Sequence, residues 1–108
     1  MANPSIATAA ELIESILAVL DDAYWEAGTI EKKDAIYALI ALLQNEKAEI
    51  AKLSIQDHDL EYEPITSDFR HVRGKLNNLR KTLDEFVMRP STAREIDRLF
   101  AKVVSLTG

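Results

Sequence analysis

Two pairs of glutamates have a spacing that could bind a metal ion. Glu11 and Glu14 lie three residues apart in one predicted helix, and Glu46 and Glu49 lie three apart in the next. Side chains at positions i and i+3 share one face of a helix, and carboxylate oxygens are suitable ligands for Mg²⁺. A metal-dependent hydrolase built on these acid pairs is therefore one hypothesis for the function. The same spacing arises easily in any acidic amphipathic helix, which is the interpretation we favour.

The segment 54–66 alternates acidic residues around one of the two histidines of the chain. An EF-hand calcium loop starting at Asp57 would need glycine at its sixth position and glutamate at its twelfth. Tyr62 and Asp68 occupy those positions, so the EF-hand pattern is absent. A loose divalent site is conceivable on three adjacent side chains, Asp57, His58 and Asp59, but a solvated acidic loop is the simpler interpretation.

The chain lacks the motifs that usually indicate catalysis. It has no Gly-rich phosphate loop, no nucleophile elbow and no Glu-x-x-His motif of the kind that builds di-iron sites in helical bundles. We therefore expect neither an enzymatic activity nor a cofactor.

Basic residues cluster in the third predicted helix with no acidic residue among them. Such a cluster can contact phosphates, so a nucleic-acid or anion binder is a further hypothesis. The net charge of −5 and the absence of a DNA-binding motif argue against nucleic acid as a partner. The residues of this predicted basic face are Arg70, Arg73, Lys75, Arg80 and Lys81.

Charge is divided unevenly along the chain. Residues 1–69 contain four Lys/Arg and fourteen Asp/Glu (net −10), whereas residues 70–108 contain nine and four (net +5). We expect the basic helix to face the acidic half, within one chain or across a dimer, rather than an external polyanion. Each exposed ion pair contributes only about 0–1 kcal/mol, so such pairing would set orientation more than stability.

The spacing of apolar residues predicts four helices joined mainly by short connections. Apolar residues recur every three or four positions in each helix. Gly28 should end the first helix in a left-handed conformation, Thr29 should cap the second, and Thr92 should open the last with a capping box. Short connections favour antiparallel neighbours, so we expect one all-α domain, 1–108, with a four-helix, mainly antiparallel bundle. The predicted helices are approximately 4–27, 30–53, 67–88 and 92–106, with a long loop at 54–66.

The second predicted helix is apolar on every side between Ala35 and Leu43. A helix that is apolar all round must be buried all round, and in so small a domain each helix normally keeps one face in water. We therefore expect helices 1 and 2 to mediate formation of a homodimer. The alternative is that the other helices of the same chain enclose the second helix. The candidate interface residues are Trp25, Ile36, Tyr37, Leu39, Ile40, Leu42 and Leu43.

Composition places the chain among small folded domains. The sequence has no cysteine, which excludes disulfides, thiolate catalysis and cysteine-ligated zinc and suits a reducing cytoplasm. No uncharged apolar run approaches the roughly 18–20 residues of a membrane span. We expect a cytoplasmic, non-catalytic protein–protein interaction module, such as a small adaptor, chaperone-like or regulatory bundle. Its expected partners are a second copy and an unidentified protein, with no membrane contact.

Overall fold

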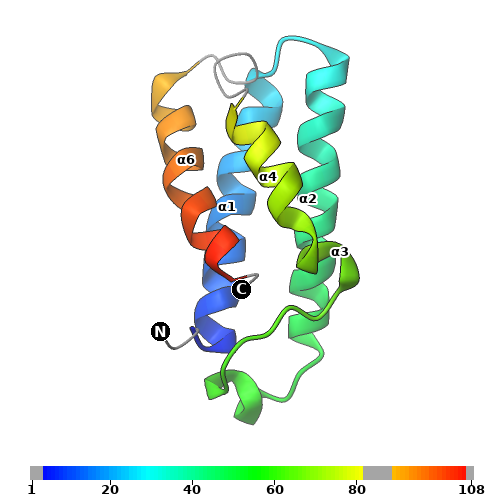
Figure 1. Ribbon diagram of the computed structural model, residues 1–108, viewed down its shortest axis with the longest axis vertical. Helices are drawn as coiled ribbons and strands as arrows, with labels where there is room; N and C mark the ends of the chain where they lie inside the picture. Colours follow the sequence, from blue (N-terminus) through cyan, green and yellow to red (C-terminus); the bar gives the residue numbers. More distant parts are fainter. Residues whose placement is uncertain (1–3, 82–88, 107–108) are drawn as a thin grey trace.

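The computed structural model describes residues 4–81 and 89–106 of the chain. These residues form five α-helices and one 3₁₀ helix, and they contain no strand beyond an isolated bridge between Ser5 and Glu61. The expected all-α class is therefore confirmed. The elements are α1 (Ile6–Glu26), α2 (Ile30–Ala51), η1 (Ile55–Asp59), α3 (Ser67–Arg70), α4 (Val72–Lys81) and α6 (Pro90–Ser105) (Figure 1).

Helices α1 and α2 form an antiparallel hairpin, since only residues 27–29 separate them (Figure 1). The Ser5 hydroxyl caps α1 by accepting a hydrogen bond from the Thr8 backbone N–H at 3.2 Å. The Thr29 hydroxyl caps α2 by accepting one from the Lys32 backbone N–H at 3.2 Å, as the sequence predicts. Each cap satisfies a backbone donor that has no partner within its helix.

The end of α1 differs from the expectation. Gly28 does not adopt a left-handed conformation. The helix ends instead at Ala27, whose backbone is extended with φ −68° and ψ 135°. Lys33 Nζ donates a hydrogen bond to the Tyr24 carbonyl oxygen at 2.6 Å. A lysine from the next helix thus pairs with a terminal carbonyl of α1 and places its positive charge at the negative end of the helix dipole.

The helix predicted at 67–88 is two helices, α3 and α4, that break at His71. His71 Nδ1 pairs with the Ser67 carbonyl oxygen at 2.9 Å, and a continuous helix would use that carbonyl for the His71 backbone N–H. The N–H donates instead to the Asp68 carbonyl at 3.2 Å, and the His71 backbone leaves the helical region with φ −108° and ψ 15°. The prediction of one continuous helix is wrong at this point, and its residues 82–88 lie outside the described residues.

Helix α6 begins at Pro90, earlier than the predicted start at Thr92. Proline is favoured at a first helical position because it has no N–H to satisfy. The carboxylate of Glu26, at the end of α1, accepts hydrogen bonds from the Arg89 backbone N–H at 3.0 Å and from the Thr92 hydroxyl at 2.8 Å. A residue distant in sequence therefore stabilises the start of α6, and the Thr92 hydroxyl, expected to cap the helix by accepting from the backbone, donates to Glu26 instead.

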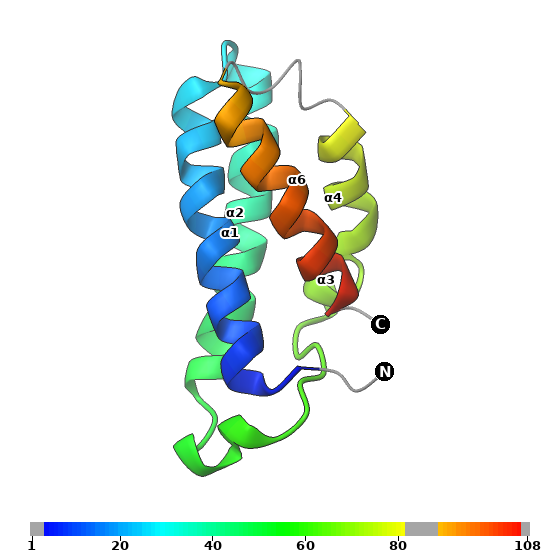
Figure 2. The same cartoon turned by 90° about the vertical axis from the view of Figure 1, so that its left-hand side faces the viewer.

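Helix α1 is central to the fold. It packs against both α2 and α6, and α4 packs against α6. In Figure 2, α4 lies on one side of the α1–α2 pair, and no described helix covers the opposite side. One buried apolar cluster joins these helices and includes Ile13, Ile16, Leu20, Ile36, Leu43, Phe69, Leu76, Ile96 and Phe100. We name the uncovered side of the α1–α2 pair the outer face. Exposed apolar side chains on this face are candidates for contacts with another molecule.

Replacing a core leucine of α4 tests this packing. Leu76 is fully buried, as the spacing of the third predicted helix requires. We expect Leu76→Ala to lower the free energy of unfolding by about 2–5 kcal/mol, because it removes apolar contacts and leaves a cavity. Urea denaturation followed by circular dichroism measures this loss. The exposed neighbour Asn77 provides the control, and a loss no larger than that of Asn77→Ala would contradict the packing described here.

Candidate functional site

A buried carboxylate on α2 holds the long connection between α2 and α3. Glu46 is completely buried, and its Oε2 accepts hydrogen bonds from the Tyr62 hydroxyl and from the Ile65 backbone N–H at 2.9 Å. Its Oε1 accepts one from the Thr66 backbone N–H at 2.8 Å. These three donors compensate the cost of removing the carboxylate from water. Glu46 is therefore a structural anchor rather than a surface acid.

The same connection also pairs with the start of the chain. The Ile6 backbone N–H donates to the Leu60 carbonyl, and the Tyr62 backbone N–H donates to the Pro4 carbonyl, both at 2.9 Å. Burial and the hydrogen bond to the Glu46 carboxylate raise the pKa of Tyr62 far above its usual value, so the phenol stays neutral in the folded chain. The segment expected to be a solvated acidic loop is thus anchored at both Glu46 and the N-terminal residues.

Three of the four glutamates in the acid pairs have other partners. Glu46 binds Tyr62, and Glu49 forms an ion pair with Lys52 at 2.9 Å. Glu14 forms an ion pair with Lys47 at 3.0 Å across the α1–α2 hairpin. Among the residues that the structure describes, no group of three His, Cys, Asp or Glu side chains is placed to hold a metal ion, and this includes Asp57, His58 and Asp59 of η1.

The predicted basic face is divided by the break at His71. Arg70 lies on α3, where its Nε donates to the Pro64 carbonyl at 3.1 Å, whereas Arg73 and Lys75 are exposed on α4. Arg80 and Lys81 belong to the last turn of α4, and their side chains lie outside the described ones. The basic residues therefore come from two helices rather than from one continuous helix face. Whether they face acidic residues stays a prediction.

The seven candidate interface residues fall into two groups. Four of them face the core of their own chain, namely Ile36, Leu39, Leu42 and Leu43. The other three lie toward the outer face: Trp25 is 72% exposed, Tyr37 is 61% exposed and Ile40 is partly buried. Ala35, Ala38 and Ala41 are exposed as well. Helix α2 is apolar on every side between Ala35 and Leu43, but its own chain buries only one of those sides.

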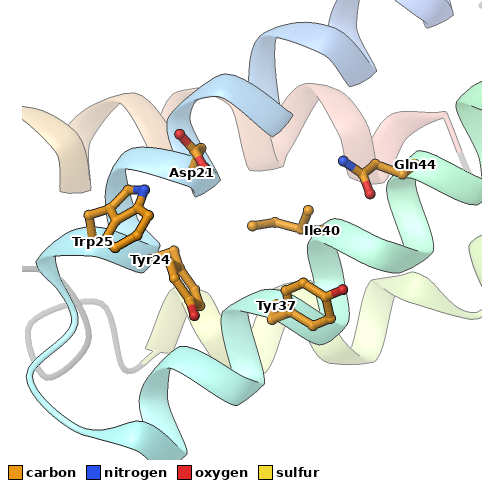
Figure 3. Close-up of a pocket in the computed structure, with 6 residues that line it drawn as sticks. All are labelled: Asp21, Tyr24, Trp25, Tyr37, Ile40 and Gln44. Carbon is orange, nitrogen blue, oxygen red and sulfur yellow. The ribbon is translucent and has the colours of Figure 1, made fainter.

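These outer residues surround a shallow hollow between α1 and α2, which we name the outer hollow. Its volume is about 320 Å³. Ile40 and Tyr24 are partly buried and packed against the core, so they form its base. Figure 3 shows Trp25 and Asp21 contributed by α1, and Tyr37 and Gln44 by α2. The complete lining is Asp21, Tyr24, Trp25, Tyr37, Ile40 and Gln44.

Two contacts fix the aromatic side of the outer hollow. The rings of Tyr24 and Trp25 meet edge to face, with centroids 5.3 Å apart and planes at 89°. Lys33 Nζ lies 4.6 Å from the Tyr24 centroid and 5.4 Å from the Trp25 centroid, within the range of a cation–π contact. The same ammonium bonds the Tyr24 carbonyl, so one lysine both ends α1 and positions the two rings.

Comparison of the chain with protein-family models, curated proteins and solved structures gave no match. Among the described residues, no helix has the length and apolar character that crossing a membrane requires. The geometry of the chain itself therefore carries the functional argument.

Sequence reasoning missed two features of this arrangement. Glu46 was interpreted as part of an acid pair, although it continues the core spacing Ile36, Leu39, Leu43, Glu46 and Ile50 in steps of three and four. That spacing was the available signal for a buried carboxylate. The second is the hollow beside Asp21, Tyr24 and Gln44, which no local pattern predicts because its lining comes from two helices, α1 and α2.

The anchor is tested by removing one charge from Glu46. Glu46→Gln keeps the shape but replaces one of the two acceptor oxygens with an NH2 group, which cannot accept, so either the Ile65 or the Thr66 backbone N–H loses its partner. We expect the free energy of unfolding to fall by about 1–3 kcal/mol, the typical cost of a buried polar group left without a partner. Chemical denaturation measures the loss. Glu49→Gln, on the exposed side of α2, is the matched control, and equal effects of the two variants would refute the anchor.

Alkaline pH tests the environment of Tyr62. The tyrosine ionises near its ordinary pKa of 10.0 in the unfolded chain but resists ionisation when folded. A group whose pKa is raised by folding contributes stability below its unfolded pKa and loses it as pH rises. Above pH 10 we expect the wild-type free energy of unfolding to fall by up to about 1.4 kcal/mol per pH unit relative to Tyr62→Phe. Parallel pH slopes for the two proteins would show that Tyr62 is not protected.

Proposed function

We propose that the chain is a non-catalytic protein–protein interaction module that self-associates through the outer face of α1 and α2. The observation that carries this proposal is the pair of large aromatic side chains, Trp25 and Tyr37, that lie exposed beside the outer hollow on a face that no helix of the described residues covers. Tryptophan and tyrosine are enriched at interfaces and at the residues that dominate binding energy. Within the proposal, the helices form a mainly antiparallel four-helix bundle in which α3 and α4 together make the third helix.

The partner proposed first is a second copy in a twofold arrangement. In such a dimer the same surface is used by both chains, so each Trp25 would meet the hollow region of the other chain. Burying two Trp25 and two Tyr37 side chains would remove roughly 500 Å² of mostly apolar surface from water, worth about 12 kcal/mol before costs. Association itself costs about 4–15 kcal/mol, so we expect a dimer at micromolar concentrations rather than a permanent one.

The two alternative functions have weaker support. A metal-dependent hydrolase would need free acid pairs, and Glu46, Glu49 and Glu14 are each occupied by a partner in the structure. A nucleic-acid or anion binder would need one continuous basic face, and the basic residues are divided between α3 and α4. The absence of cysteine fits a reducing compartment, and the cytoplasm is the proposed location.

Light scattering across a concentration series tests self-association. We expect a mass approaching twice the 12.1 kDa of one chain at micromolar concentrations. Ala41→Glu should restore the mass of one chain, because it adds an unpaired charge to the outer face without disturbing the core or the helix propensity of α2. Leu42→Glu is unsuitable, since Leu42 is buried within its own chain.

The matched control is Ala101→Glu, which makes the same change at an exposed alanine of α6. This variant should keep the wild-type mass, because α6 is not part of the outer face. A mass of one chain for the wild type at every concentration would refute the proposal. An equal effect of Ala41→Glu and Ala101→Glu would show association through another surface.

A further inference from the structure

We infer that the outer hollow is a binding site for an arginine side chain presented by a partner protein. This inference goes beyond self-association and does not depend on it, because all the residues of the hollow belong to one chain. It rests on the combination of aromatic rings with a carboxylate and an amide around one shallow space.

The aromatic part of the hollow attracts cations. Three of its six lining residues are Tyr24, Trp25 and Tyr37, and the face of each ring carries partial negative charge. The chain already uses this property, since the Lys33 ammonium lies over the rings of Tyr24 and Trp25. Lys33 is not among the lining residues, so its side chain leaves the hollow itself open to another cation.

The polar part of the hollow complements a positive charge. Asp21 is the charged residue of the lining, and it has neither an ion pair nor a side-chain hydrogen bond within the part of the chain that the structure describes. Gln44, at the α2 side, is exposed and offers an amide oxygen as an acceptor. A cation in the hollow would therefore meet the Asp21 carboxylate, the Gln44 amide oxygen and the ring of Tyr37, because the Lys33 ammonium already lies over the other two rings.

Arginine fits these features better than lysine does. Its guanidinium group is planar, stacks on aromatic rings and pairs with a carboxylate through two parallel N–H donors. The guanidinium group is also less strongly hydrated than an ammonium group. Its weaker hydration favours binding at this hollow, which is open to solvent: the Trp25 side chain is 72% exposed. A volume of about 320 Å³ accommodates a long side chain but not a folded segment. An acidic side chain would be repelled by Asp21.

The site is tested by titrating the full-length chain with acetyl-arginine N-methylamide while following tryptophan fluorescence. Trp25 is the single tryptophan of the chain and lines the hollow, so it reports binding directly. The reference probe is the citrulline analogue, which has nearly the same shape but no charge. Because a second copy would cover the hollow, every titration is run at a protein concentration at which light scattering gives the mass of one chain.

We expect a saturable fluorescence change with the arginine probe and a markedly higher half-saturation concentration with the citrulline probe. Asp21→Asn should raise the half-saturation concentration for arginine by about five-fold, because it removes a charge-assisted hydrogen bond. The control is Asp22→Asn, which alters the adjacent exposed aspartate outside the hollow and should bind as the parent does. Tyr37→Leu should also weaken binding, because it removes one ring, and circular dichroism confirms that each variant is folded.

Equal binding of the two probes, or unchanged binding by both Asp21→Asn and Tyr37→Leu, would overturn the inference, as would the lack of any saturable change. These results are separable from the test of self-association. A wild-type chain that stays a monomer refutes the proposed dimer and leaves the titration readable. A dimer that dissociates on Ala41→Glu, with no arginine binding by the single chain, supports the interaction module and refutes this site.

Discussion

The buried carboxylate of Glu46 requires partners, and the fold between α2 and α4 is arranged around that requirement. An uncompensated charge in an apolar core costs several kcal/mol, so the chain must bring hydrogen-bond donors to this position. It does so by folding residues 60–66 back over α2. Thr66 then serves twice, because its backbone N–H binds Glu46 while its hydroxyl accepts from the Phe69 N–H at 3.1 Å and starts α3. Phe69 is thereby directed into the core, edge to face with Tyr62 at 6.2 Å.

Contacts distant in sequence also fix the opposite end of the molecule. Glu26 supplies the acceptors for the start of α6, and Lys33 supplies the donor for the end of α1. Both side chains carry the charge that the respective helix dipole favours. Both residues are neighbours of Trp25: Glu26 follows it in the sequence, and the Lys33 ammonium lies over its ring. The contacts that close the helix ends therefore also determine where the exposed aromatic residues lie, and they couple the outer hollow to the stability of the hairpin.

The sequence predicts this fold well where neighbours within a helix decide the structure and poorly where distant contacts do. The apolar spacing places α1 and α2 within a few residues of their ends and identifies Leu76 and Leu79 as core positions. It fails at His71, whose side chain competes for a backbone carbonyl, and at Thr92, whose hydroxyl donates to Glu26 instead of capping the helix. The candidate site follows the same division. Trp25 and Tyr37 were recognisable as off the main apolar stripes, whereas the hollow between them depends on two helices at once.

Helix α2 departs from the usual pattern of a surface helix at a few positions on both its inner and its outer side. A helix at the surface of a domain normally places polar residues outside and apolar ones inside. Helix α2 places a glutamate inside at Glu46 and a tyrosine with several alanines outside, at Tyr37, Ala38 and Ala41. The inner glutamate is explained by the anchor that it forms. Alanine is the strongest helix former, so Ala38 and Ala41 suit α2 even when exposed, whereas the exposed Tyr37 ring adds little to the packing of the described residues. The exposed rings of Trp25 and Tyr37 and the carboxylate of Asp21 lie beside one hollow, and this arrangement supports the binding roles that we propose for the outer face.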